Sequence, residues 1–147
     1  MKPEGPPIPV LRQTRWTFDL PVQGQSMEPL LRVGDVVAVV CCPLDEVRVG
    51  DLICFQRGAD KVLHRLVERR ADAWYEKGDA ELGGQWIRPD TVFGKALSIN
   101  GQPLDDARQL SALRLARFEY RLRNALPRIK LPRCCVALWK RWKARRL

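Results

Sequence analysis

Histidine, aromatic side chains and regularly spaced cysteines are scarce in this sequence. One histidine occurs in 147 residues, and 7% of the residues are aromatic. The five cysteines include two adjacent pairs and no C-x-x-C spacing, so neither a disulfide framework nor a zinc site of the usual Cys/His type is expected. We therefore expect reduced, partly buried thiols, as in a cytosolic protein, and no metal or other cofactor.

Long apolar runs are also lacking. The longest one, Val36 to Cys42, has the length of a strand and falls far short of the roughly 18–20 residues that a membrane-spanning helix needs. The N-terminal segment MKPEGPPIP lacks the apolar stretch of a signal peptide. We expect a cytoplasmic protein, with peripheral attachment to a membrane as the alternative if its C-terminal tail docks on lipid.

Positive charge is concentrated at the C-terminal end. Residues 1–104 carry 13 Lys and Arg against 14 Asp and Glu, whereas residues 105–147 carry 13 against 3. The whole net charge of +9 therefore comes from the tail. This division predicts a nearly neutral unit with a basic appendage that faces a polyanion. The candidates are an anionic membrane surface, an acidic partner and nucleic acid, of which the membrane surface is favoured and nucleic acid is not.

Short apolar segments separated by Gly-Asp and Asn-Gly turns indicate a β domain over residues 10–104, preceded by a flexible N-terminus over 1–9. Their spacing of 8–12 residues is typical of a coiled antiparallel sheet or a partly open barrel. The predicted fold class is therefore mainly β, with a C-terminal helical tail. The expected strands cover 10–22, 36–42, 52–56, 62–69, 74–76 and 91–99.

The tail, residues 105–147, shows helical periodicity. A helix is expected to begin at the acidic pair Asp105-Asp106 and to end at Pro127. Its apolar residues recur at helical spacing with arginines between them: Leu115, Phe118, Leu122 and Leu126. They either pack on the sheet, with the basic residues merely facing water, or form part of a surface that binds a polyanion. In segment 134–147, tryptophans interleave with basic residues, which suits an interfacial helix.

The segment from Gly24 to Leu31 is the best candidate for a catalytic turn. A turn that enters a short helix would expose Ser26 and aim backbone N–H groups at an oxyanion. A serine hydroxyl becomes a nucleophile only beside a base, and the lone histidine, His64, is the candidate for that role. Its alternative interpretation is a partly buried structural histidine in the predicted strand over 62–69.

Six short motifs occur in the order found in one family of serine peptidases. They are G-x-S-M-x-P-x-L from Gly24, then Gly34-Asp35, Gly50-Asp51, His64-Arg65, Lys77-Gly78-Asp79 and Gly94-Lys95. Over about residues 22–99 the chain resembles the signal peptidase I family. More narrowly, it resembles the branch of archaea, the endoplasmic reticulum and some bacteria, in which histidine replaces lysine as the base.

This resemblance implies roles for individual residues. Ser26 would be the acyl-forming nucleophile and His64 its base, and the Ser26 N–H would form part of the oxyanion hole. Met27 would line the substrate cleft, together with Gly24 and Gln25. Some members carry a hydroxyl two residues before the nucleophile, where this chain has Gly24, so another donor would be needed.

The third catalytic residue is less well defined by the resemblance. In this branch a carboxylate in or just after the K-G-D motif orients the imidazole, which favours Asp79. Asp90 is the alternative if the following loop is longer here, since no aspartate matches the family's second position. Asp79 can also be read as a turn residue that binds backbone N–H groups. Lys61 falls three residues short of the family's lysine position and is not favoured as a base.

By this resemblance, we expect a serine endopeptidase that cleaves a peptide or protein through an acyl-enzyme. Its substrate would be an extended peptide, held as an added strand, with small residues before the cut. Two other classes stay open: a peptide-binding module without catalysis, and an adaptor whose basic tail binds a membrane surface or nucleic acid. The self-cleaving SOS-type repressors have a similar scaffold, but their lysine base and DNA-binding domain have no counterpart in this sequence.

Overall fold

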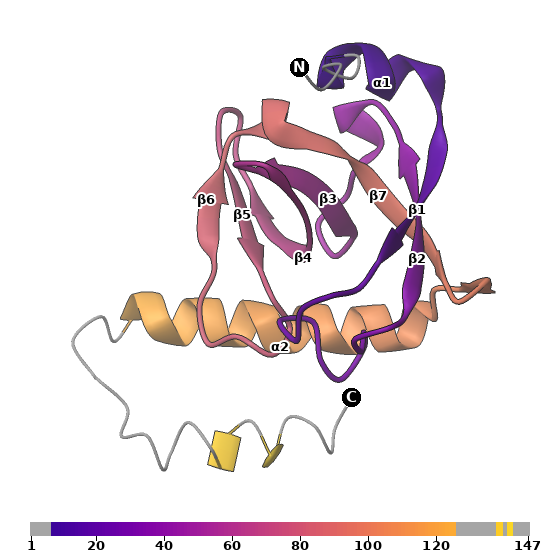
Figure 1. The fold of residues 1–147 in the computed structure, drawn as a ribbon. Coiled ribbons are helices and arrows are strands. Elements are labelled where there is room, and N and C mark those ends of the chain that lie inside the picture. The colour runs from indigo at the N-terminus through magenta and orange to yellow at the C-terminus, as the bar shows by residue number, and fades with distance from the viewer. Residues whose placement is uncertain (1–6, 126–137, 140, 143–147) are drawn as a thin grey trace.

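The computed structural model describes residues 7–125 together with residues 138, 139, 141 and 142. Eight antiparallel strands form one open sheet in the order β1-β2-β7-β3-β4-β5-β6, with β8 paired to β7, and a long helix follows them (Figure 1). The mainly β fold with a C-terminal helix is thus confirmed. The strands are β1 Thr17–Pro21, β2 Val36–Cys41, β3 Leu52–Arg57, β4 Asp60–Arg69, β5 Trp74–Lys77, β6 Gln85–Ile87, β7 Val92–Ile99 and β8 Gln102–Pro103.

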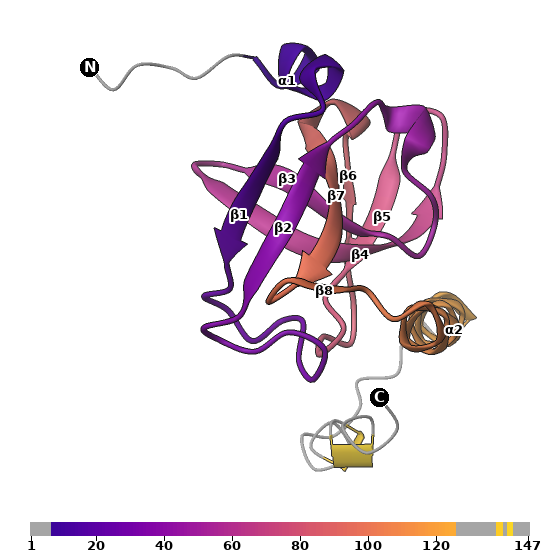
Figure 2. The same cartoon turned by 90° about the vertical axis from the view of Figure 1, so that its right-hand side faces the viewer.

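The sheet curls on itself but does not close. Strand β1 pairs with β2, and β6 pairs with β5, while β1 and β6 do not pair with each other. The curl is visible in the two perpendicular views of Figures 1 and 2. Register shifts in the pairings of β2 with β7, β3 with β7, and β4 with β5 mark local irregularities of the kind that bend strands.

Strand β3 is buried on both faces and separates two apolar cores. Leu52 and Cys54 belong to a core with Met27 and Leu31, whereas Ile53 and Phe55 belong to a second one. A strand buried on both faces has a continuous apolar run instead of an alternating one, as Leu52–Phe55 shows. The first core lies directly beneath the turn that carries Ser26, because Met27 is the residue after the serine.

The Ser26 turn belongs to a loop over residues 22–35. Its ends are joined where the Gly34 N–H donates to the Val22 carbonyl at 3.0 Å and the Val22 N–H to the Asp35 carbonyl at 2.8 Å. The expected short helix does not form, since residues 23–34 contain turns and bends but no helix. One helix-like bond, from the Leu31 N–H to the Met27 carbonyl, holds the centre of the loop at 3.0 Å.

The N-terminal region departs from the expected single strand over residues 10–22. A short helix, α1 Ile8–Thr14, comes first, and the strand is confined to Thr17–Pro21. Ile8 and Leu11, three residues apart, pack on the first core, while the Arg12 guanidinium donates to the Val92 carbonyl at 2.7 Å. These tertiary contacts favour a helix where the local apolar pattern suggested a strand. Residues 1–6 of the expected flexible N-terminus lie outside the described part of the chain.

Short 3-10 turns at Leu44–Glu46 and Pro89–Thr91 complete the domain. Strand β6 lies within residues 80–90, for which the sequence predicts a loop and no strand. Its three residues pair with β5, and Trp86 packs edge-on against Tyr75 with ring centroids 5.3 Å apart. The pairing partner therefore determines this strand more than its own sequence does.

The expected tail helix is confirmed as α2 Asp106–Ala125, which lies along the outside of the sheet (Figures 1 and 2). Its buried residues are Ala112, Leu113, Ala116 and Glu119. The expected end at Pro127 and most of the expected interfacial segment 134–147 lie outside the described residues. Among the helices that the structure describes, none is long and apolar enough to span a membrane.

Candidate active site

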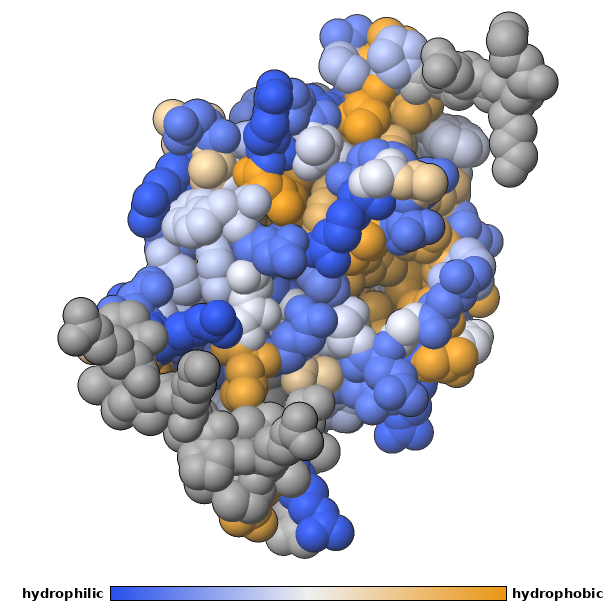
Figure 3. All heavy atoms as spheres, turned by 60° about the vertical axis from the view of Figure 1, so that its left-hand side comes forward, coloured by the Kyte–Doolittle hydropathy of each residue, from blue (hydrophilic) through white to orange (hydrophobic). Residues whose placement is uncertain are grey.

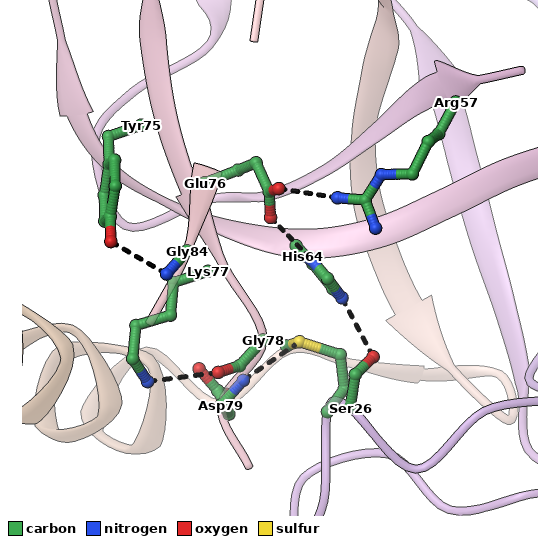
Figure 4. A network of polar contacts seen from close by, with 10 residues as sticks. Ser26, Arg57, His64, Tyr75, Glu76, Lys77, Gly78, Asp79 and Gly84 are labelled. Carbon is green, nitrogen blue, oxygen red and sulfur yellow. Dashed lines mark hydrogen bonds and ion pairs between the residues drawn. The ribbon is translucent and has the colours of Figure 1, made fainter. Parts of the chain in front are cut away.

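Ser26 and His64 meet at one end of the curled sheet, 38 residues apart in sequence. The Ser26 Oγ lies 2.9 Å from His64 Nε2, which is hydrogen-bonding distance (Figure 4). His64 belongs to β4 and its side chain is only 3% exposed, whereas Ser26 comes from the loop over 22–35. The two residues expected to form the catalytic pair are therefore in contact.

The other nitrogen of the imidazole faces a carboxylate that the sequence did not lead us to expect. His64 Nδ1 contacts one oxygen of Glu76, and the Arg57 guanidinium donates to the other oxygen at 2.6 Å. An ionised carboxylate only accepts hydrogen bonds, so Nδ1 carries the proton and Nε2 is left to accept from the serine hydroxyl. This is the tautomer that a general base requires.

Strand register explains why Glu76 reaches the imidazole. Strands β4 and β5 are antiparallel, with Leu66 opposite Glu76 and Arg65 opposite Lys77. Opposed residues share a face of the sheet, and alternate residues along a strand share it too. Glu76 is therefore diagonal to His64 on the same face, within reach of a long side chain.

Asp79, the expected third residue, does not contact His64. Asp79 lies in the turn after β5 and pairs with Arg65, on the face opposite to His64. There the Arg65 guanidinium donates to both Asp79 oxygens, at 2.8 and 2.6 Å, and both side chains are buried. The expectation that Asp79 orients the base must therefore be corrected, because Asp79 neutralises a buried arginine instead.

The main chain around Gly78 fixes the Ser26 turn against β5. The Ala80 N–H donates to the Ser26 carbonyl at 2.8 Å, and the Asp79 N–H points at the Met27 sulfur at 3.4 Å. A Cβ added to Gly78 would lie only 2.6 Å from the Ser26 carbonyl oxygen. Glycine is thus required for this close approach of two backbones, and the K-G-D motif positions the serine through its main chain.

An elongated cleft of about 500 Å³ contains the Ser–His pair. One wall is the end of β1 with residues 22–24, the opposite wall is the start of β4, and Met27 and Leu31 lie between them. Figure 3 shows an apolar hollow whose rim is hydrophilic. Gly24 and Met27 line the cleft as expected, whereas Gln25 lines a neighbouring hollow of about 650 Å³ on the other side of Ser26.

The two alternative candidates lie outside the Ser–His–Glu chain of contacts. Asp90 pairs with Arg88 at 2.6 Å, and both side chains are well exposed. Lys61 lines the cleft, where its Nζ lies 5.8 Å from the centres of the Phe18 and Phe93 rings. Lys61 therefore contributes positive charge to the cleft, and no hydrogen bond joins it to Ser26 in the described structure.

The thiols of the described cysteines are poor nucleophiles. Cys41, Cys42 and Cys54 are all free and buried. Burial raises the pKa of Cys54 to about 12, so the reactive thiolate is scarce at neutral pH. No cluster of three or more metal-ligating side chains occurs among the residues that the structure describes. The Ser26 hydroxyl, which contacts the imidazole, is accordingly a better candidate for a nucleophile than these thiols.

Sequence reasoning missed Glu76 and Arg57. The signal for Glu76 was its place in the predicted strand over 74–76, because the only carboxylate in that strand had to face one side or the other of the sheet. The register with β4, which decides the side, depends on the turn over 70–73 and could not be derived. Arg57 ends β3 beside Gly58, and no pattern of its own sets it apart from other exposed arginines.

Comparison with known proteins gives no assignment of its own. No protein-family model matches the chain, and no curated protein matches its sequence significantly.

Proposed function

We propose that this protein is a serine endopeptidase of the signal peptidase I type, in which Ser26 is the nucleophile, His64 the general base and Glu76 the residue that orients the base. The observation that carries the proposal is the continuous series of contacts from the Ser26 hydroxyl through the imidazole to a buried carboxylate. A structural histidine needs no hydroxyl in a cleft, whereas an acyl-transfer site needs this combination.

Acylation would begin when His64 Nε2 takes the proton of the Ser26 hydroxyl as Oγ attacks the substrate carbonyl carbon. The C=O electron pair moves onto its oxygen and gives a tetrahedral oxyanion. When that oxyanion collapses, the peptide C–N bond breaks and Nε2 returns the proton to the departing amine. Glu76 holds the ring and stabilises the imidazolium during both steps.

Deacylation would repeat the sequence with water. The imidazole takes a proton from a water molecule, whose oxygen attacks the ester carbon and releases Ser26 with its proton restored. Both tetrahedral intermediates need hydrogen-bond donors. The Ser26 N–H donates no hydrogen bond within the described residues and is the first such donor.

The cleft favours an extended peptide as substrate. Residues 60–64 of β4 pair only with β3, and β1 pairs only with β2, among the strands that the structure describes. Both strands line the cleft, so each offers an unpaired edge to it. A peptide inserted between them could form main-chain hydrogen bonds as an added strand, which leaves pockets on alternate sides for its side chains.

The test is cleavage of a diverse peptide mixture, read by mass spectrometry, with the wild type and with Ser26→Ala and His64→Ala. We expect the wild type to cut and both variants to lose cleavage while remaining folded by circular dichroism. Ser98→Ala is the matched control, since Ser98 lies in β7 and lines neither hollow beside Ser26.

Equal cleavage by the wild type and Ser26→Ala would refute the assignment of the nucleophile. If no protein cuts the mixture, binding of the same peptides decides between a binding module and an inactive fold. Saturable binding that depends on the cleft and is unchanged in Ser26→Ala would replace the catalytic proposal with a binding role.

A further inference from the structure

Helix α2 presents an apolar row on the side that faces away from the sheet. Leu115, Phe118 and Leu122 follow one another at spacings of three and four residues, which places them on one side of a helix. Phe118 is 56% exposed and Leu122 44% exposed, whereas Leu115 is half-buried. The opposite side is used for packing, because the helix buries Ala112, Leu113, Ala116 and Glu119.

A row of arginines runs beside this apolar row. Arg114, Arg117 and Arg121 each precede one of its members by a single residue, and all three are exposed. The two rows together form what we call the docking face, and it contains no acidic residue. The acidic residues of α2 lie elsewhere, with Asp106 at the start of the helix and Glu119 buried against Lys77 of the sheet.

The attachment of α2 to the sheet is made mainly by residues outside the docking face. Of that face, Arg117 and Arg121 also line a hollow of about 310 Å³ together with Glu68 and Arg69 of β4. Glu119 forms an ion pair with Lys77, and the Arg65 guanidinium donates to Gln109 at 2.7 Å. Tyr120 packs on Tyr75 with ring centroids 4.5 Å apart. Figure 2 shows the helix nearly end-on, with one side against the sheet and the other directed outward.

The sequence that follows α2 continues the same chemistry. Residues 126–147 contain eight Lys and Arg, no Asp or Glu, and two tryptophans. Exposed apolar side chains therefore lie beside arginines, and Trp and basic residues follow them in the sequence. This combination is complementary to an anionic lipid bilayer, which has an apolar interior and anionic headgroups. Nucleic acid would be complementary to the arginines but would leave Phe118 and Leu122 exposed to water.

We infer that the docking face of α2 binds an anionic lipid bilayer, with Phe118 and Leu122 inserted at the level of the headgroups and the arginine row bound to lipid phosphates. This inference does not depend on the proposed peptidase activity. If that activity is established, attachment through α2 would hold the cleft near the bilayer, because Arg65 contacts both Gln109 of α2 and Asp79 behind the Ser26 turn.

The test is co-sedimentation of the full chain with vesicles of phosphatidylcholine, alone or mixed with phosphatidylglycerol. We expect binding to the mixed vesicles only, weakened by high salt. Arg114→Gln/Arg117→Gln/Arg121→Gln should weaken it by roughly fivefold for each arginine, on the order of a hundredfold in all. Phe118→Ser/Leu122→Ser should weaken it about tenfold or more. The matched controls remove exposed residues elsewhere: Arg32→Gln/Arg70→Gln/Arg88→Gln and Leu97→Ser.

Each other outcome would overturn the inference. Wild-type binding by the α2 variants would assign attachment to residues 126–147 alone. Equal binding to both kinds of vesicle would remove the anionic requirement. If no vesicles are bound but RNA is bound in a salt-sensitive way, the docking face would be assigned to nucleic acid. If no vesicles are bound but the chain forms a dimer that Phe118→Ser/Leu122→Ser dissociates, the docking face would be assigned to a second copy. Circular dichroism and thermal unfolding of each variant separate these results from a failure to fold.

Discussion

Replacing Glu76 by glutamine tests the central feature of the site. The substitution keeps the shape of the side chain but removes the charge between Arg57 and His64. Both neighbours donate hydrogen bonds to the carboxylate, while the amide of glutamine has one acceptor oxygen and one donor nitrogen. One hydrogen bond is therefore lost, or the imidazole adopts the tautomer that cannot accept the serine proton.

The magnitude follows from electrostatics. Unit charges about 4 Å apart attract each other by about 4 kcal/mol at an effective dielectric constant of 20. Losing this stabilisation of the imidazolium in the transition state corresponds to a decrease of about 10³-fold in kcat. A shift of tautomer would increase the loss toward the roughly 10⁴-fold seen when the aspartate of a Ser-His-Asp triad is replaced by its amide. Stability should change little, since Arg57 is 43% exposed and can turn to water.

The matched comparison is Asp79→Asn, which changes a buried carboxylate of the same strand-and-turn segment. It leaves the fully buried Arg65 without its bidentate partner, which should cost about 3–5 kcal/mol of folding free energy. It leaves the contacts of His64 intact, so kcat per folded molecule should stay within about threefold. Peptide cleavage and urea unfolding, measured side by side, provide both quantities.

The reasoning would be refuted by the reverse result. If folded Asp79→Asn lost cleavage a thousandfold while Glu76→Gln retained it within tenfold, the orienting carboxylate would be Asp79 and the observed ion pair with Arg65 would not describe the working enzyme.

Three further predictions concern the surroundings of the site. Gly78→Ala should lower kcat far more than stability, because the added Cβ would displace the Ser26 main chain from a distance of 2.6 Å. Cys54 should resist thiol reagents at pH 8 until the protein is unfolded, because burial raises its pKa to about 12. Asp35→Asn should destabilise the protein at pH 7 but not at low pH. Hydrogen bonds, chiefly from the Arg32 N–H, lower the folded pKa of Asp35, so its stabilisation exists above the unfolded value of about 4 and disappears as pH falls through the folded one.

Controls accompany these measurements. Gly24→Ala should leave stability unchanged, because a Cβ there meets nothing within 4 Å. Rapid labelling of native Cys54, followed by mass spectrometry of the modified peptide, would contradict the burial of that strand. A constant difference between wild type and Asp35→Asn in unfolding free energy from pH 7 to pH 3 would show that the Asp35 carboxylate is not the group responsible.

The sequence was sufficient to predict what depends on local patterns. Short apolar runs and Gly-Asp turns indicated most strands, and the lone histidine opposite a serine turn indicated the central contact. The sequence was insufficient wherever an element forms only because of the neighbour that it pairs with or packs on. Strand β6 forms because β5 is beside it, and α1 forms because Ile8 and Leu11 find a core to pack on.

The carboxylate expected as the third catalytic residue shows the same limit of sequence-based prediction at the site itself. Glu76 and Asp79 are both close to the expected motif in sequence. The register of β5 against β4 places Glu76 beside His64, whereas Asp79 follows the strand in a turn and pairs with Arg65. That register follows from a shift between Leu66 and Glu68, which no periodicity reveals. The K-G-D motif predicted Asp79 as the orienting carboxylate, whereas the alternation of side chains along β5 indicates Glu76.

The two faces of strands β4 and β5 make different contacts. His64 and Glu76 contact each other on the face that carries the candidate site, while Arg65 and Lys77 lie on the other face. There Lys77 pairs with Glu119 of α2, and the Arg65 guanidinium pairs with Asp79, in the turn after β5, and donates to Gln109 of α2. Adjacent residues of one strand, such as His64 and Arg65, therefore contribute to different properties of the protein. If the proposed activity is correct, mutations on the first face can alter turnover without loosening the attachment of the helix. Mutations on the other face can then alter that attachment without touching Ser26 or His64, so the two properties are free to evolve separately.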